Sequence, residues 1–164
     1  MIDLLLCAVD LSALNSIPKN EILVSALLET REITKPYGLR LCPTGDLSGK
    51  RLPDEQLSLF LHGRLASGTV RTHSGKEITI RSGKPVTMDD GFNCPSSHQP
   101  GDAIDLGFRP DASSTAPIIW WDDMTVEQHE VFMACVEVLA EHGWSWGGNW
   151  HHPDYHHFYR GKAR

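Results

Sequence analysis

The spacing of apolar and polar positions predicts three helices. Residues 20–30 and residues 53–61 each carry apolar side chains three or four positions apart, which places them on one helical face. Residues 125–142 show the same spacing over a longer stretch. We therefore expect the longest helix of the chain at residues 125–142.

The ends of this longest helix are marked by residues typical of helix caps. Thr125 and Gln128 form the sequence pattern of a capping box, and Gly143 is suited to the C-terminal stop. The buried stripe of this helix is expected to contain Phe132, Met133, Val136, Leu139 and Ala140. Met133 and Cys135 are accordingly interpreted as core residues and not as redox or metal groups.

The remaining pattern predicts short strands. Residues 69–72 and 77–80 alternate and are rich in β-formers, and residues 73–76 between them have the composition of a hairpin loop. Further short strands are expected at residues 103–106, 118–121, 144–146 and 156–159. Because strands and helices do not alternate regularly, we expect an α+β fold. The prediction is one small domain over residues 1–164, with a short antiparallel sheet and flanking helices.

Composition narrows the class of function. With 40% apolar residues and 22% charged residues, the chain has the make-up of a folded globular domain. A net charge of -6 argues against binding to nucleic acid or to an anionic membrane surface. The N-terminal apolar run, residues 4–9, matches neither a signal peptide nor a membrane span. The 4 cysteines are widely spaced, so we expect reduced thiols in a protein made in a cytoplasm.

Histidines are concentrated in the C-terminal part of the chain. One of them belongs to a residue pattern that is unlikely to occur by chance. His98 and Asp105 belong to the pattern S-x-H-x-x-G-x-A-x-D, which runs from Ser96 to Asp105. Asp105 also lies within an apolar predicted strand, where an unpaired carboxylate would be costly. Imidazole and carboxylate groups are zinc ligands, and three such ligands with an open fourth position make a catalytic site.

This motif resembles that of the zinc D-alanyl-D-alanine carboxypeptidase and L-alanyl-D-glutamate endopeptidase family, which includes many bacteriophage endolysins. Two further blocks support the resemblance: residues 146–150 with residues 154–158, and residues 51–56 with Gly63, Arg64, Val86 and Thr87. The similarity covers residues 49–159. Residues 1–48 are interpreted as a helical N-terminal extension of unclear role.

The sequence departs from the family pattern at three places. Asn149 stands where the family commonly has Asp, Tyr159 stands where Glu often follows, and residues 72–84 have the form of an insertion. None of these changes removes a candidate metal ligand. We expect all three to lie near the substrate cleft.

The resemblance implies a role for each candidate site residue. It makes His98, Asp105 and His157 the zinc ligands, Asp154 the general base and acid, and Arg51 the residue that binds substrate and stabilises the oxyanion. From the residues alone, His156 remains an alternative to His157, because neighbouring strand residues face opposite sides. The assignment of both Asp154 and His157 requires the chain to turn between them.

Large aromatic residues and glycines near this cluster have two interpretations. Trp144, Trp146 and Trp150 could line a cleft or pack in the core, and the pair Gly147 and Gly148 could allow the substrate backbone to approach closely. His151 and His152 receive no assignment.

These observations lead us to expect a monomeric zinc metallopeptidase that hydrolyses an amide bond in the peptide stem of peptidoglycan. The expected setting is a phage or prophage endolysin that stays in the host cytoplasm until a holin opens the membrane, and then acts on the cell wall. The alternatives are a non-catalytic wall-binding or virion structural protein that retains this fold, and a D-Ala-D-Ala carboxypeptidase.

Overall fold

The computed structural model describes residues 20–161 except 46, 73 and 113–114. The helices are α2 (Asn20–Thr34), α3 (Pro53–Leu61) and α4 (Val126–Glu141), with short 3-10 turns at Lys35–Tyr37, Trp121–Asp123 and Gly147–Asn149. The strands are β1 (Leu39–Pro43), β2 (Gly68–Arg71), β3 (Glu77–Ile80), β4 (Ala103–Pro110), β5 (Ser145–Trp146) and β6 (His157–Tyr159).

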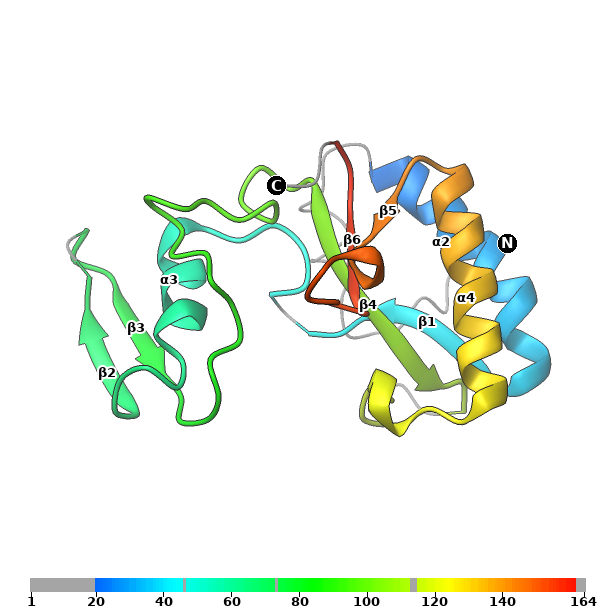
Figure 1. Ribbon diagram of the computed structural model, residues 1–164, viewed down its shortest axis with the longest axis horizontal. Helices are drawn as coiled ribbons and strands as arrows, with labels where there is room; N and C mark the ends of the chain where they lie inside the picture. Colours follow the sequence, from blue (N-terminus) through cyan, green and yellow to red (C-terminus); the bar gives the residue numbers. More distant parts are fainter. Residues whose placement is uncertain (1–19, 46, 73, 113–114, 162–164) are drawn as a thin grey trace.

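Four of the strands form an antiparallel sheet in the order β1-β4-β6-β5. Helices α2 and α4 lie together beside this sheet (Figure 1), and their apolar residues join those of the strands in one core cluster. This arrangement confirms the predicted α+β fold with a short antiparallel sheet and flanking helices.

The central strand β4 has two chemically different faces, because successive side chains of a strand point to opposite sides. Ile104, Leu106 and Phe108 are fully buried in the core cluster shared with the helices. Asp105 therefore projects from the opposite face. In β6, Phe158 belongs to the core cluster and His157 lies on the side of Asp105. The sheet thus separates the core from the candidate site.

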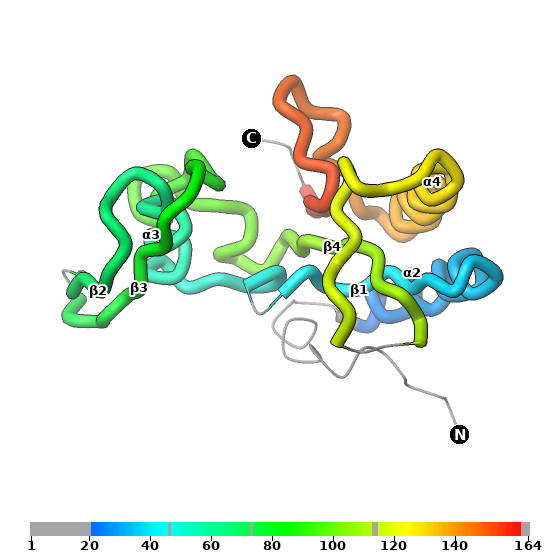
Figure 2. Tube along the Cα trace, turned by 90° about the horizontal axis from the view of Figure 1, so that it is seen from below, coloured from blue at the N-terminus to red at the C-terminus, as the bar shows by residue number. Residues whose placement is uncertain are grey.

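Helix α3 and the β2–β3 hairpin form a second structural unit, which lies at the far end of the molecule from α2 and α4 (Figures 1 and 2). Ile78 and Ile80 of β3 are buried, while their strand neighbours are exposed. Ser58 of α3 donates a hydrogen bond to the carbonyl of Thr79 at 2.5 Å. The hairpin is therefore attached to α3 through both apolar and polar contacts.

Most predicted elements are confirmed. Helix α3 begins and ends as expected, α2 extends one turn beyond residue 30, and the hairpin forms as predicted. The capping box of α4 is present, since the Thr125 hydroxyl accepts from the amide of Gln128 and the Gln128 side chain accepts from the amide of Thr125. Gly143 follows this helix with φ 81°.

Two expectations about this part of the fold are wrong. Residues 118–121 form only an isolated bridge, Phe108 to Ile119, followed by a 3-10 turn. In α4, Met133 and Ala140 face solvent, and the buried side chains are those of Val131, Phe132, Cys135, Val136 and Leu139. The reason is that α4 carries apolar residues on more than one side. The sequence pattern alone therefore does not determine which side is buried.

The N-terminal part of the resolved structure contributes to the core. Leu23, Ala26 and Leu27 of α2 and Leu39 and Leu41 of β1 belong to the main apolar cluster. The sequence left the role of residues 1–48 open. Within this range, β1 adds an edge strand to the sheet, and α2 packs its apolar residues into the core. The predictions for the apolar run at residues 4–9, for Cys7 and for His73 in the hairpin loop lie outside the described residues.

The described cysteines form no disulfide; Cys42 and Cys135 are buried and Cys94 is exposed. Burial raises the pKa of the Cys135 thiol to about 12, which agrees with its interpretation as a core residue. Across residues 20–161, apart from the gaps given above, no helix is both long and apolar enough to cross a membrane.

Candidate metal centre

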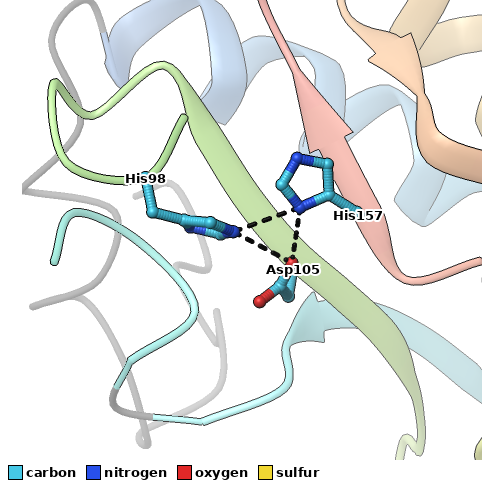
Figure 3. Close-up of side chains that lie close together, drawn as sticks. All are labelled: His98, Asp105 and His157. Atoms are coloured by element: carbon cyan, nitrogen blue, oxygen red, sulfur yellow. Dashed lines mark hydrogen bonds and ion pairs between the residues drawn. The ribbon is translucent and has the colours of Figure 1, made fainter. Parts of the chain in front are cut away.

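The structure brings His98, Asp105 and His157 into one cluster, with their ligand atoms facing each other (Figure 3). The Nε2 atom of His98 lies 3.1 Å from Nδ1 of His157. The Oδ1 atom of Asp105 lies 3.1 Å from Nδ1 of His157 and 3.3 Å from Nε2 of His98. The three predicted ligands therefore form a nearly equilateral triangle of two nitrogens and one oxygen.

Two features of the backbone bring these side chains together. Asp105 and His157 are direct partners in the antiparallel register of β4 and β6. His98 belongs to a tight turn just before β4, in which its carbonyl accepts from the amide of Gly101 at 3.0 Å. The turn and the sheet therefore position the triangle before any ligand is considered.

Each imidazole is held by a hydrogen bond at its other nitrogen. Nδ1 of His98 lies 2.9 Å from the carbonyl oxygen of Gly49, which can only accept, so Nδ1 carries a proton and Nε2 is the atom directed at the other two residues. Nε2 of His157 lies 3.2 Å from the hydroxyl of Ser97. Such outer hydrogen bonds fix the ring orientation of metal-binding histidines. The sequence offered no signal for the parts that Gly49 and Ser97 play.

The carboxylate of Asp105 is held in its charged form. Burial by itself would raise its pKa, but the nearby His98 and the hydrogen bonds from both histidines act in the opposite direction. The Arg51 guanidinium adds to this effect, so that the pKa of Asp105 lies well below its ordinary value. Asp105 therefore presents an anionic oxygen, which is the form that binds a metal.

Arg51 lies directly against the metal-ligand cluster. Its Nη2 donates to Oδ2 of Asp105 at 2.5 Å, its Nε donates to the carbonyl of Leu47, and its Nη1 donates to Oε1 of Gln56 at 3.3 Å. Three of the five N–H groups of the guanidinium are thus engaged. The other two have no partner among the described residues, and Arg51 lines the cleft described below.

The chain turns between Asp154 and His157, as the assignment of both residues required. The amide of His157 donates to the carbonyl of Asp154 at 3.2 Å, and β6 begins only after this turn. The exposed side chain of Asp154 lines the same cleft as the ligand cluster, and its Oδ1 accepts from the amide of His156 at 3.3 Å. The structure thus places Asp154 at the cleft, and among the described residues its carboxylate has no hydrogen bond or ion pair with a candidate ligand side chain.

His156 is directed away from the cluster. Its Nδ1 donates to the carbonyl of Leu106 at 2.8 Å, and its Nε2 accepts from the amide of Trp121 at 3.2 Å. Both nitrogens are therefore used in joining β6 to β4 and to the turn at Trp121. Of the two adjacent histidines, His157 alone lies within the triangle.

The triangle fits a tetrahedral zinc ion. Zinc bonds of about 2.0–2.1 Å at tetrahedral angles separate the ligand atoms by about 3.3–3.4 Å. The edges of the triangle, 3.1, 3.1 and 3.3 Å, are close to this spacing. Two imidazole nitrogens and one carboxylate oxygen are also a donor set that zinc takes, with a fourth position left for water or substrate.

The cluster lies in a cleft of about 940 Å³. One wall belongs to the main sheet and its loops, and the other wall belongs to α3, β3 and the segment that follows β3. Trp150 and Trp120 line the cleft, although Trp120 was not anticipated. Trp144 and Trp146 are buried in the core cluster, so the cleft interpretation is wrong for these two residues.

Gly147 and Gly148 are needed for packing within the protein. A Cβ atom on Gly147 would lie 2.8 Å from the carbonyl oxygen of Asp154, and one on Gly148 would lie 2.2 Å from the ring of Trp146. The interpretation that these glycines open a path for the substrate backbone is therefore replaced by close packing, of Gly147 against the segment before β6 and of Gly148 against Trp146. Asn149 and Tyr159, also expected near the cleft, do not line it.

Comparisons with known proteins agree with this geometry. Residues 91–160 match the profile of a family described as D-alanyl-D-alanine carboxypeptidase. Among solved structures, the chain is similar to the L-Ala D-Glu endopeptidase ChiX of Serratia marcescens, with a TM-score of 0.50 and 17% sequence identity. The alignment covers 94% of this chain and 88% of the other. No curated protein matches the sequence.

At 17% identity, the structural similarity concerns the fold. The family match covers the turn at His98, the strands β4 and β6 and the turn at Asp154. Both comparisons are with peptidases, which supports the predicted class of enzyme. The matched segment, residues 91–160, contains His98, Asp105 and His157.

Proposed function

We propose that this protein is a zinc peptidase that hydrolyses an amide bond in the peptide stem of bacterial peptidoglycan. The observation that carries the proposal is the triangle of His98, Asp105 and His157, which has the donor set and spacing of an open zinc site and lies in a cleft. The substrate class is supported by the names of the family and of the structural neighbour, both of which refer to bonds of the peptidoglycan stem.

In this proposal the three ligands hold the zinc ion on the cleft side of the sheet. When bound, zinc supplies a Lewis acid that polarises the scissile carbonyl and lowers the pKa of water toward about 7. The protein's own contribution is to fix the ligand atoms. The carbonyl of Gly49 orients His98, the hydroxyl of Ser97 lies at the second nitrogen of His157, and Arg51 holds Oδ2 of Asp105 while Oδ1 faces the histidines.

Two further residues are proposed to act on the substrate. Asp154 lines the cleft with an exposed carboxylate, so it is placed to take a proton from the attacking water and to return it to the leaving amine. Arg51 retains two N–H groups that have no partner among the described residues. These groups can donate to the oxyanion that forms at the scissile carbonyl.

Metal analysis combined with a peptidoglycan digestion assay tests the proposal. The purified protein should contain about one zinc ion per chain and should lose hydrolysis when the metal is removed by a chelator. Folded His98→Ala protein is the control and should have neither zinc nor activity. Absence of metal, with hydrolysis unchanged in chelator, would refute the proposal.

The family description favours one alternative within the enzyme class, a D-Ala-D-Ala carboxypeptidase. Mass spectrometry of digested peptidoglycan separates the two activities. A carboxypeptidase releases free D-alanine, whereas an endopeptidase cuts the stem internally. A protein that binds walls without hydrolysing any stem bond would correspond to the non-catalytic alternative.

The biological setting that we propose is lysis by a phage or prophage. In this setting the monomeric protein accumulates in the cytoplasm of the host and reaches the wall after a holin opens the membrane. Expression in a bacterial host with and without a holin, followed by turbidity, tests this part separately. Lysis in the absence of any membrane lesion would contradict it.

A further inference from the structure

The β2–β3 hairpin overlaps the stretch that has the form of an insertion, and it lies beside the cleft without a role in the proposed metal chemistry. Thr79 of β3 and Arg81, directly after β3, line the cleft together with Ser58 and His62 of the α3 region. The metal ligands lie on the opposite wall. The outer wall of the cleft is thus partly formed by this hairpin.

This wall is held in a defined position. The carbonyl of Arg81 accepts from the amide of Gly63 at 3.2 Å, just after α3. A Cβ atom on Gly63 would lie 2.3 Å from the carbonyl oxygen of Gly83, and Gly63 has φ 71°, so this junction requires glycine. Together with the burial of Ile78 and Ile80, these contacts fix the backbone on both sides of Arg81.

Both walls of the cleft carry charged groups. The inner wall presents Asp105 and Asp154, and the guanidinium of Arg51 on that wall is already paired with Asp105. The outer wall contains Asp89 as well as Arg81, but Arg81 is exposed, and its side chain has no hydrogen-bond or ion-pair partner among the described residues. A cation in a cleft without a protein partner is available for an anionic group of a ligand.

The size of the cleft admits a ligand that reaches this wall. A volume of about 940 Å³ is near the upper end of the roughly 300–1,000 Å³ that is typical of ligand pockets. It can therefore hold several residues of a peptide between the metal ligands and the hairpin. Peptidoglycan stems carry free carboxylates, both on an acidic residue within the stem and at the C-terminal residue.

We propose that the β2–β3 hairpin forms the outer wall of the substrate cleft and that Arg81 binds a carboxylate of the stem peptide. This inference rests on the proposed function for the identity of the substrate. Arg81 acts here as a residue that determines specificity, and it takes no part in proton transfer or in zinc binding.

The experiment compares Arg81→Ala with the wild-type enzyme on three synthetic stem peptides. The first has both carboxylates free, the second is amidated on its internal acidic residue, and the third is amidated at its C-terminus. Arg71→Ala is the matched control, because Arg71 lies on the same hairpin, pairs with Glu77 at 3.3 Å and does not line the cleft.

Loss of one charge-assisted contact should raise KM for the fully free peptide by about tenfold and leave kcat within about twofold. Amidation of the carboxylate that Arg81 binds should raise the wild-type KM by a similar factor and should have no further effect on Arg81→Ala. Arg81→Lys should recover part of the affinity, and Arg71→Ala should match the wild type. The peptide whose amidation has this effect identifies which carboxylate is bound.

Equal KM values for Arg81→Ala and wild type on all three peptides would overturn the inference while leaving the proposed function intact. If the wild type cleaves none of the peptides, the proposed function fails, and calorimetric binding of the same peptides becomes the readout. Weaker binding of the free peptide by Arg81→Ala would then support the inference, and equal binding would overturn it.

Discussion

At the scale of single residues, Asp105 shows how the protein stabilises a charge in a largely buried position. Its two oxygens have different partners: Oδ1 faces the two imidazoles, and Oδ2 accepts from Arg51. An isolated buried carboxylate would become protonated, whereas these partners keep it anionic. Oδ1 of Asp105 can thus serve as a metal ligand while Oδ2 is held in place by Arg51.

The first prediction separates the neighbouring side chains before β6. His157→Ala should lose both zinc and hydrolysis, because it removes one corner of the triangle. Asp154→Ala should lose hydrolysis and retain zinc, since its carboxylate is outside the triangle. His156→Ala should retain zinc but should be less stable by about 1–3 kcal/mol, because it leaves the Leu106 carbonyl and the Trp121 amide without partners.

Zinc content, wall hydrolysis and denaturant unfolding of the three purified variants check this prediction. Asp102→Ala, at an exposed position just before β4, is a control for changes near the site. Zinc retained in His157→Ala and lost in His156→Ala would exchange the roles of the two histidines.

The second prediction concerns the hydroxyl of Ser97. Ser97→Ala removes the partner of Nε2 of His157, so zinc affinity should fall by about 10-fold to 100-fold. Competition with a chromophoric chelator measures this change independently of activity. Ser97→Thr keeps a hydroxyl and should recover most of the affinity, and Ser58→Ala in α3 should behave as the wild type. Unchanged zinc affinity in Ser97→Ala would show that the contact between Ser97 and His157 does not contribute to zinc binding.

At the scale of elements, short-range sequence patterns predicted most of the helices and the hairpin. The capping box and glycine stop of α4, the bounds of α3 and the β2–β3 hairpin follow from side-chain spacing within a few residues. Strand β1 was not predicted, although all five of its residues are buried. Its sequence does not alternate, because it is covered on both faces, and only its pairing with β4 makes it a strand.

The same limit applies to the candidate site. The motif from Ser96 to Asp105 indicated two ligands, and the resemblance indicated His157. The parts of Gly49, Ser97 and Trp120 depend on contacts between distant segments, and no pattern of residues marks such contacts in advance. The positions of Trp144 and Trp146 in the core are likewise decided by which face of a short strand meets α4.

The third prediction concerns the turn that precedes the metal motif. The Asp90 carboxylate accepts from the amides of Phe92, Asn93 and Cys94 at 2.8–2.9 Å. The hydrogen bonds from Cys94 and Phe92 and from the Asn93 side chain lower the pKa of Asp90 from 3.8 to about 2. A lowered pKa in the folded state means that the carboxylate stabilises the fold above pH 3.8 and that this contribution is lost as the pH falls through about 2.

Unfolding of the wild type and Asp90→Asn at several pH values measures this effect. The wild type should be the more stable protein at about pH 5, and the difference should shrink as the pH approaches about 2. Because other carboxylates titrate equally in both proteins, the difference isolates Asp90. A difference that is independent of pH would show that the turn does not depend on the charge.

At the scale of the whole molecule, a metal ion would join parts of the chain that the sequence keeps apart. His98 lies 59 residues from His157, and Asp105 lies 52 residues from it. A zinc ion held by these three residues ties the turn before β4 to both central strands. Metal binding should therefore stabilise the fold as a whole.

The fourth prediction follows from this coupling. Free zinc at about 100 times its dissociation constant should stabilise the folded state by about 2.7 kcal/mol, which corresponds to a rise in Tm of about 5–10 °C for a domain of this size. Calorimetry of the protein with zinc and with chelator measures the rise. His98→Ala should show little response to zinc, and a full response in that variant would place the stabilising ion elsewhere.

The register of β4 and β6 determines which of the two adjacent histidines lies opposite Asp105. Sliding β6 by one residue would bring His156 opposite Asp105, so the tandem histidines offer an imidazole in either alignment. The same slip would turn Phe158, which is fully buried, toward the opposite face of the sheet. The apolar core therefore selects which histidine lies opposite Asp105, through a phenylalanine that is not part of the candidate metal site.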